Sequence, residues 1–567
     1  MPQRGRAFLP SHAKARDNCL LRGLVLPASS TAMNSKLIAE FLEGIKNGTE
    51  PLSDFKQSIP KSRDVFVNRN LRMRNIKMIG FDMDYTLADY EREAFEELAF
   101  NITVEKLIKK RGYPEEIRSI RYKPRAVIRG LVVDKKRGNI LKVDAFQYVA
   151  RAVHGKQLLT KDERRSLYAS SKMNLSDANF VSVDTMFSLP EVYLYAELVQ
   201  FFDRAAEPNR LRAVSANEPP PPRPVPMGAV LSAEGKVDYG KIFDDLRAML
   251  DEAHADNSLK SVVLQDLPRY IRKDPRLAVT LYNFRMNGKK LFLLTNSEWY
   301  YTDAVMKHLL DGELAEMPRW RDFFDVVIVS SKKPGWFKNG HPFLRIDDER
   351  SGASSEATEP SFQPGKVYER GNLNDFERMA GARGDEIFYV GDHIYGDILR
   401  SKKDSLWRTC MIVSELEEEL AKTEALLPRI EKLEKLKKEK NTLDLKESTT
   451  LERIDKLRQF KIHNFDQLSK QDLRLIDEEI TRALEYMNKI TGNLTDILVK
   501  IKKLEQGIDQ SYNDVWGELF REGTENTRFA DQIKDYACVY TSRVSNFSSY
   551  SPTRYFQSPK DMMPHEL

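Results

Sequence analysis

The hydrophobic positions of the chain form four short runs that have the composition of buried β-strands. Each run is rich in apolar or β-branched residues and is followed at once by polar ones. Ligands of open α/β sheets bind at the carboxyl ends of parallel strands. The pattern therefore predicts an α/β fold whose polar strand ends form one site. The expected strands are residues 76–81, 290–294, 326–329 and 387–390.

A second apolar pattern, with alternating spacings of four and three, extends from Ile476 to Ile508. A repeat of this kind over more than four heptads is typical of a coiled-coil seam. A weaker apolar stripe runs from Leu416 to Leu436, and Pro428 interrupts it. We expect an antiparallel helical hairpin that packs within the chain or between subunits, and a homo-oligomer. The seam positions are Ile476, Ile480, Ala483, Met487, Ile490, Leu494, Ile497, Ile501, Leu504 and Ile508.

Two carboxylates, Asp82 and Asp84, stand two residues apart at the end of the first predicted strand. If the strand continues to Asp82, both carboxylates face one small volume. Their repulsion would raise one pKa unless a divalent cation neutralised it. The pair suits an aspartate nucleophile that attacks phosphorus beside an acid that protonates the leaving oxygen.

The other three strand ends carry groups that suit phosphate and magnesium. Thr295, Asn296 and Ser297 follow the second strand, and their hydroxyls, amide and backbone N–H groups can hold phosphate oxygens. The third strand delivers Lys333. The fourth is followed by a glycine turn with Asp392 and Asp397, which supply the hard oxygen ligands that Mg²⁺ prefers.

Each of these groups also has an ordinary structural interpretation. The two aspartates after the first strand could cap a helix, Lys333 could be a solvated charge beside a proline turn, and Asp392 and Asp397 could be turn residues. The four elements together, in this order along the chain, favour catalysis.

The order and content of these elements resemble the haloacid dehalogenase superfamily, and most closely its cytosolic purine 5′-nucleotidase family. The resemblance runs from Phe66 to Met563 and is most specific at residues 80–88, Gly-Phe-Asp-Met-Asp-Tyr-Thr-Leu-Ala, and at residues 391–403. It implies a Rossmann-like core with a large inserted cap. It also implies Asp82 as the nucleophile, Asp84 as the general acid/base, and Thr295, Asn296, Ser297 and Lys333 as the phosphate ligands. Mg²⁺ would be held by Asp82, Asp392, Asp397 and the backbone carbonyl of Asp84.

About 210 residues separate Asp84 from Thr295, far more than one crossover helix needs. A cap is therefore expected there, and caps close over a site and select the substrate. We expect helices at residues 191–202 and 239–254 on either side of a stiff proline run, residues 219–226. A second low-complexity segment, residues 351–361, is interpreted as a loop.

The second of these cap helices places Arg247, Asp251 and His254 on one face, and Lys260 follows its end. Such a face can be a solvated ion-pair surface, or it can read a purine edge. The resemblance implies the second interpretation, and it implies that Phe187 stacks on the base. A guanidinium and a carboxylate together suit the O6 acceptor and N1–H donor of a 6-oxopurine.

The chain departs from the family at an adenine-nucleotide effector pocket. Asn174 and Asp184 stand where the regulated members have Arg and Asn, whereas Tyr395 and Lys403 keep the aromatic and basic partners. The exchange removes a cation and adds an anion. The resemblance therefore does not carry activation by ATP over to this chain.

Composition narrows the class of protein further. The 567 residues are 41% hydrophobic, enough for a large core and several domains. The net charge of +5 is nearly balanced, which gives no nucleic-acid or membrane signal. Three cysteines far apart favour a reducing, cytoplasmic location. Residues 1–33 are basic and poor in acids, and we expect a disordered segment, although a targeting peptide would share this composition.

The predicted domains are as follows: residues 34–94 and 271–413 form the catalytic core, 95–270 the cap, 414–510 the helical hairpin, and 511–567 a segment that packs on the core. The predicted function is Mg²⁺-dependent hydrolysis of purine nucleoside 5′-monophosphates of the IMP and GMP type, with nucleoside phosphotransfer as a side reaction. Two alternatives remain: a phosphatase of the same fold with another substrate, and a vestigial scaffold that works through its coiled coil.

Overall fold

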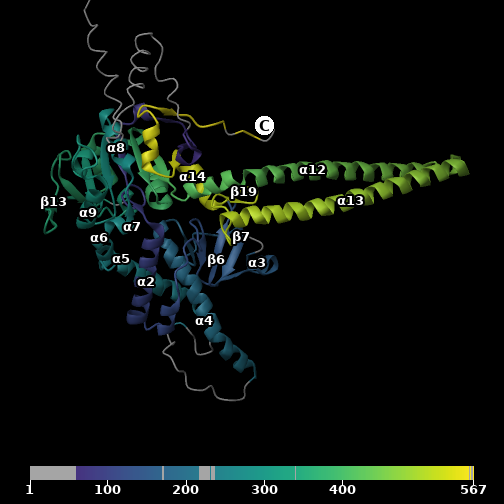
Figure 1. The fold of residues 1–567 in the computed structure, drawn as a ribbon, viewed down its shortest axis with the longest axis horizontal. Helices are drawn as coiled ribbons and strands as arrows, with labels where there is room; N and C mark the ends of the chain where they lie inside the picture. The colour runs from purple at the N-terminus through teal and green to yellow at the C-terminus, as the bar shows by residue number, and fades with distance from the viewer. Residues whose placement is uncertain are drawn as a thin grey trace, which may run out of the picture.

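A computed structural model describes residues 59–168, 172–215, 230, 236–338, 340–560, 562–563 and 566. The basic segment at residues 1–33 and the proline run at 219–226 lie outside these residues. At the centre is a ten-stranded mixed sheet with helices around it (Figure 1). In spatial order its strands are β1 (Phe66–Val67), β20 (Val539–Thr541), β17 (Arg408–Ile412), β16 (Ile387–Gly391), β3 (Met78–Phe81), β11 (Lys290–Leu294), β12 (Val326–Val329), β15 (Val367–Arg370), β13 (Phe343–Asp348) and β14 (Ala353–Glu356).

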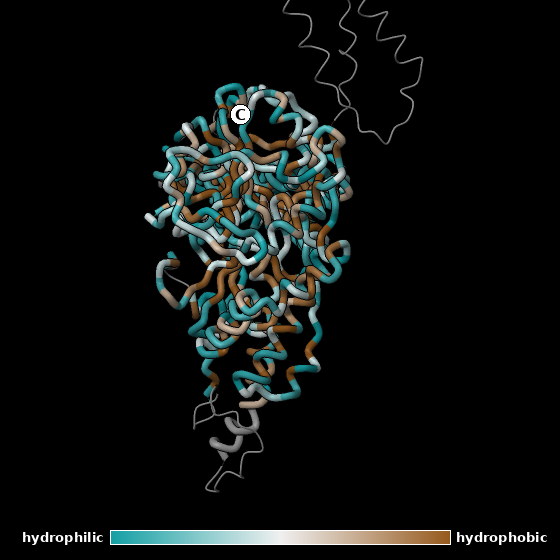
Figure 2. Tube along the Cα trace, turned by 90° about the vertical axis from the view of Figure 1, so that its left-hand side faces the viewer, coloured by the Kyte–Doolittle hydropathy of each residue, from teal (hydrophilic) through white to brown (hydrophobic). Residues whose placement is uncertain are grey.

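The strands from β20 to β15 run parallel, and the outer pairs are antiparallel. The four strands expected from the apolar runs are β3, β11, β12 and β16, which confirms that part of the prediction. Alternate residues of these strands belong to two separate apolar clusters: Ile79 and Phe81 to one, Met78 and Phe292 to the other. Both faces of the sheet are therefore buried, as parallel sheets require. Figure 2 shows the resulting apolar interior within a polar exterior.

Helices of the sheet region include α8 (Pro275–Met286), α9 (Trp299–Leu310), α10 (Leu373–Ala380) and α14 (Arg528–Tyr536). Gly80 in β3 allows the ring of Phe292, on the neighbouring strand β11, to pack closely against the strand. A Cβ at position 80 would lie 2.1 Å from that ring. The C-terminal segment packs on this region and supplies β20 to the sheet. Cys410 lies on β17, and Cys538 directly precedes β20, its neighbour in the sheet. Both cysteines are buried and free.

The interpretation of residues 351–361 as a loop is wrong in part. Residues Ala353–Glu356 form β14, which pairs antiparallel with β13 at the edge of the sheet. All four residues of β14 are exposed, so the strand carries no apolar alternation that could reveal it.

The inserted segment begins with α2 (Arg92–Arg111) and contains a five-stranded antiparallel sheet. Its strands, in spatial order, are β8 (Gln157–Leu158), β7 (Val149–His154), β6 (Asn139–Val143), β5 (Val132–Asp134) and β9 (Phe180–Ser182). Helices α4 (Leu189–Ser215) and α5 (Tyr239–Ala255) confirm the two helices expected in the inserted segment. The short helices α6 (Lys260–Gln265) and α7 (Leu267–Tyr270) lead back to the sheet region.

Two long helices, α12 (Leu416–His463) and α13 (Lys470–Tyr512), lie side by side as an antiparallel hairpin that projects from the rest of the chain (Figure 1). The expected hairpin is confirmed, and none of the heptad positions is exposed. The seam packs within the chain, because Ile497, Ile501 and Ile508 of α13 share an apolar cluster with Leu426 and Leu433 of α12.

Pro428 interrupts the weaker apolar stripe of the sequence, but the helix α12 continues through it. Pro428 is exposed, so the carbonyl group that loses its helical N–H partner lies on the side that water can reach. Packing of α12 against α13 outweighs that lost hydrogen bond. Among the helices that the structure describes, none is long and apolar enough to cross a membrane.

Candidate active site

Three carboxylates meet at the carboxyl end of the central sheet. Asp82 follows β3, Asp392 follows β16, and Asp397 lies in a short π-helical turn, Ile394–Leu399. One oxygen of each carboxylate lies within 4.8 Å of the other two. Gly391 permits this approach, because a Cβ there would lie 2.5 Å from Asp397.

Lys333 is buried among these acids. Its Nζ donates to Asp397 Oδ1 at 2.7 Å and to the Tyr389 hydroxyl at 2.8 Å, and it lies 3.0 Å from Asp82 Oδ1. Burial opposes the charge of Lys333, but Asp397 and Asp82 outweigh it and raise the pKa of the ammonium. A fixed cation therefore lies beside two of the three carboxylates.

The three acids have more negative charge than one lysine neutralises. Burial raises the pKa of Asp82 to about 7 against the opposing effect of Lys333, and burial with the nearby Asp397 raises the pKa of Asp392 well above its usual range. Oδ2 of Asp392 is buried and has no hydrogen-bond partner. A hard divalent cation among these oxygens would supply that partner and restore the ionised carboxylates, so the donor set fits Mg²⁺.

Asp84 lies apart from this cluster. Strand β3 ends at Phe81, and the residues after it form a turn in which Tyr85 has a positive φ of 54°. The Asp84 carboxylate accepts hydrogen bonds from the Tyr90 hydroxyl at 2.6 Å and from Ser297 Oγ at 2.7 Å. Burial raises the pKa of Asp84 although these two donors oppose the shift. A raised pKa suits a carboxyl group that gives up a proton.

The predicted phosphate ligands of β11 make specific contacts of their own. Thr295 is fully buried, and its hydroxyl accepts from the backbone N–H of Ser297 at 3.1 Å. The Asn296 side chain accepts from the backbone N–H of Lys333 at 2.6 Å and donates to its carbonyl oxygen at 3.0 Å. Asn296 thus fixes the segment that carries Lys333, and its place in phosphate binding stays a prediction.

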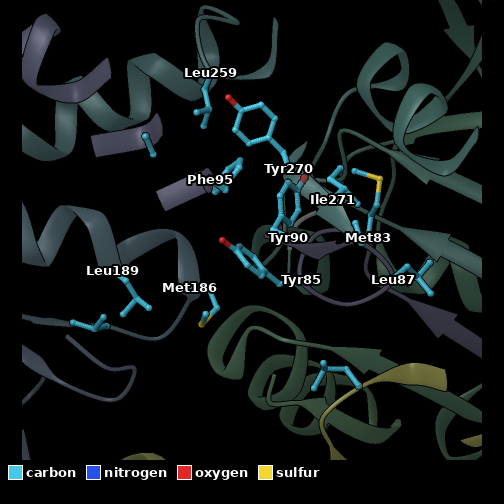
Figure 3. Packing of buried hydrophobic residues seen from close by; sticks show 14 of the residues in the cluster. Met83, Tyr85, Leu87, Tyr90, Phe95, Met186, Leu189, Leu259, Tyr270 and Ile271 are labelled. Carbon is cyan, nitrogen blue, oxygen red and sulfur yellow. The ribbon is translucent and has the colours of Figure 1, made fainter. Parts of the chain in front are cut away.

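A small cavity of about 40 Å³ connects Asp84 to the cap. Of the predicted substrate residues, Phe187, His254 and Lys260 line this cavity together with Asp84 and Ser297. The Phe187 ring stands edge-on to His254 and to Tyr85, at 5.5 and 4.8 Å between ring centroids. Tyr90 and Phe95, which line this cavity, pack with the ring of Tyr85 (Figure 3).

Arg247 and Asp251 are not among the residues that line this cavity. One edge of the Arg247 guanidinium engages Glu191 of α4: Nε donates to Oε1, and Nη2 donates to Oε2 at 2.6 Å. Asp251 is exposed on the same helix face. Lys260 forms an ion pair with Glu298, at the entrance to α9. These contacts organise the cap face, while the reading of a base by this face stays a prediction.

The four positions that correspond to the family's effector pocket make the following contacts. Asn174 accepts from the backbone N–H of Ser176, and Oδ1 of Asp184 is buried without a hydrogen-bond partner. Tyr395 is 38% exposed and stacks with Arg400. The Lys403 ammonium lies 5.3 Å from the centre of the Tyr536 ring.

Several residues of the site were not identified from the sequence. Tyr90 and Tyr301 form a hydroxyl pair at 2.8 Å behind Asp84, and Tyr389 contacts Lys333 and Asp397. Glu191 holds Arg247. Tyr389 lies on β16. Side chains of a strand point alternately to its two faces, so the periodicity of this strand could have indicated that Tyr389 lies on the face of Lys333. The other three lie on separate elements and have no local signal.

Comparison with known proteins agrees with this geometry. The family model described as "5′ nucleotidase family" matches residues 65–567. A 5′-nucleotidase domain-containing protein of Dictyostelium discoideum is 29% identical over 516 residues, which cover 89% of this chain and 75% of that protein. Human 5′-nucleotidase domain-containing protein 2 is 29% identical over 418 residues, 70% of this chain and 72% of that protein. The chain therefore belongs to the 5′ nucleotidase family, and is a phosphoric monoester hydrolase of that type.

Proposed function

We propose that the protein is a Mg²⁺-dependent 5′-nucleotidase with a core of the haloacid dehalogenase type, which hydrolyses purine nucleoside 5′-monophosphates. One observation carries the proposal. A single cavity is lined by Asp84 and Ser297 of the sheet region and by Phe187, His254 and Lys260 of the inserted segment. A phosphate at the strand ends would therefore lie next to the side chains proposed to hold a nucleoside.

In the proposed mechanism Asp82 attacks the phosphorus atom and becomes an aspartyl phosphate, while the 5′-oxygen leaves. Asp84 donates its proton to that oxygen, and then takes a proton from the water that hydrolyses the intermediate. Tyr90 and Ser297 hold the Asp84 carboxylate in place for both transfers. A nucleoside hydroxyl in place of water would give phosphotransfer.

Asp82, Asp392 and Asp397, with the backbone carbonyl of Asp84, are the residues that would hold Mg²⁺. When bound, Mg²⁺ supplies charge neutralisation for the phosphoryl oxygens and the carboxylates. Lys333, already fixed by Asp397 and Tyr389, would bind a phosphate oxygen beside Asp82. Thr295 and Ser297 would add a hydroxyl and backbone N–H groups.

The proposed base preference is for a 6-oxopurine, as in IMP and GMP. Phe187 offers an aromatic surface, and burial lowers the pKa of His254 to about 4, so its neutral imidazole presents one donor and one acceptor. Arg247 and Asp251 lie on the same helix, α5. A cytoplasmic location and association into homo-oligomers stay predictions. The second is tested by light scattering of the purified protein.

Phosphate release from a panel of IMP, GMP, AMP, CMP and p-nitrophenyl phosphate tests the proposal. We expect activity that depends on Mg²⁺, that excess chelator abolishes, and that is highest with IMP and GMP. Activity undiminished in chelator would contradict the metal assignment. Equal activity on all five substrates would contradict the purine assignment. A protein inactive on every one of them would favour the scaffold alternative.

A further inference from the structure

Arg129 is a buried arginine of the inserted segment that reaches the carboxyl end of the central sheet. Its side chain is fully buried, at 0% exposure. Its Nε and Nη2 donate to the two carboxylate oxygens of Glu415, at 2.7 and 2.5 Å. Its Nη1 donates at 2.9 Å to the backbone carbonyl oxygen of Asp392, the acid that follows β16. One guanidinium therefore joins the cap, the carboxylate cluster and the start of the hairpin.

The surroundings hold this guanidinium in one place. It lies over the Phe529 ring of α14, 5.2 Å from the ring centre. The next residue, Gly130, has a φ of 82°, and a Cβ there would lie 2.5 Å from Phe529. Glu415 follows β17, the neighbour of β16 in the sheet, so the contacts of Arg129 span the ends of two adjacent strands.

We propose that Arg129 is a positioning residue that fixes the backbone of Asp392, so that the Asp392 carboxylate faces Asp82 and Asp397, and that Glu415 orients Arg129 for this contact. The inference rests on the proposed function, because it takes Asp392 as a magnesium ligand. A planar guanidinium can hold a carboxylate with one edge and a carbonyl oxygen with another N–H at the same time. A lysine ammonium has no such fork, so Arg129→Lys keeps the charge beside Glu415 and loses the hold on Asp392.

Arg151 provides a matched control. It lies on β7, and it pairs with Glu522 at 2.9 Å and with Asp509 at 2.8 Å. It thus joins the inserted segment to the end of the hairpin, as Arg129 joins it to the start. Its hydrogen bonds go to Asp509, Glu522 and the Val515 carbonyl, and not to the three clustered carboxylates. Arg151→Lys therefore weakens a comparable ionic link away from the proposed metal site.

The test is a Mg²⁺ titration of the full chain in the absence of substrate. Binding is measured by the shift in Tm. We expect Arg129→Lys to weaken Mg²⁺ binding about tenfold or more, as the loss of a group that orients a metal ligand does. Arg151→Lys should bind Mg²⁺ as the wild type does. Phosphate release at saturating Mg²⁺ should show the nucleotide KM of Arg129→Lys nearly unchanged. Arg129→Met, if it folds, should weaken Mg²⁺ binding at least as much.

Wild-type Mg²⁺ affinity in Arg129→Lys, or an equal loss of affinity in Arg151→Lys, would overturn the inference, and so would a wild type whose Tm does not respond to Mg²⁺. The proposed function can fail separately. A wild type that binds Mg²⁺ through this site but releases no phosphate from nucleoside monophosphates would overturn that function and leave the positioning role of Arg129 in place.

Discussion

Lys333 and Asp82 form a buried ion pair, with 3.0 Å between Nζ and Oδ1 and side chains only 3% and 13% exposed. The pair joins the ends of β12 and β3, which are not neighbours in the sheet, because β11 lies between them. Lys333 also holds Asp397, so it links three separate segments of the carboxylate cluster. The ion pair is therefore both part of the proposed phosphate site and part of what keeps the cluster together.

Replacement of Lys333 by Met should abolish most of the activity. The substitution leaves Asp82 and Asp397 facing each other without their buried cation, and it removes the donor proposed to bind the phosphate, an effect of about 10²–10³ in kcat. The matched control is Lys332→Met, since Lys332 is the exposed neighbour in the same segment. Steady-state kinetics of both variants decide the matter, and equal activity in the two would contradict the role of Lys333.

Replacement of Asp82 by Asn should remove turnover by about four orders of magnitude or more, because an amide cannot become an acyl phosphate. Beryllium fluoride with Mg²⁺ should inhibit the wild type as a mimic of the phosphorylated aspartate. Substantial residual hydrolysis in Asp82→Asn would point to direct attack by water.

The central strands and their polar ends could be predicted because each is a local pattern. Asp82, Thr295 and Asp392 each follow an apolar run directly, and the sheet then brings the strand ends together. Their partners could not be predicted in the same way. Tyr301, Glu191 and Arg129 act through contacts between distant segments, and the residues around them carry no pattern that indicates which contact forms.

Pro428 and β14 show where local rules are overridden. A proline inside a helix normally marks a break, but the contacts of Leu426 and Leu433 with α13 keep α12 continuous. β14 is polar and exposed throughout, and it forms because β13 offers a free edge. In both cases the deciding interaction is with another element of the fold.

Replacement of Ile490 and Ile497 by Asp should unfold the hairpin. Both side chains are buried in the seam, and each substitution costs about 2–5 kcal/mol or more, since a charge replaces packed apolar volume. The matched control carries Leu498→Asp and Val499→Asp, because these side chains are 49% and 63% exposed on the same helix. Loss of helical ellipticity in the first variant alone is the expected result. Equal melting curves would mean that the seam contributes nothing.

The neutral state of His254 should make stability depend on pH. Burial, with a smaller effect of Lys260, lowers the pKa of His254 from 6.5 to about 4. The unfolded chain therefore takes up a proton first as the pH falls, so the contribution of this residue is present above pH 6.5 and is lost between pH 6.5 and 4. The free energy of unfolding of the wild type should fall across this window relative to His254→Gln.

The base preference depends most on the face of α5. If Arg247 and Asp251 read O6 and N1–H, kcat/KM should be higher for IMP and GMP than for AMP and CMP, because a mismatched base leaves polar groups unpaired at about 1–3 kcal/mol each. Asp251→Ala should then reduce kcat/KM for IMP far more than for p-nitrophenyl phosphate, which has no base. Asp244→Ala is the matched control, since Asp244 lies on the same helix but pairs with Lys135. A uniform loss on every substrate in Asp251→Ala would mean that this face of α5 is solvated surface held by the Arg247–Glu191 pair.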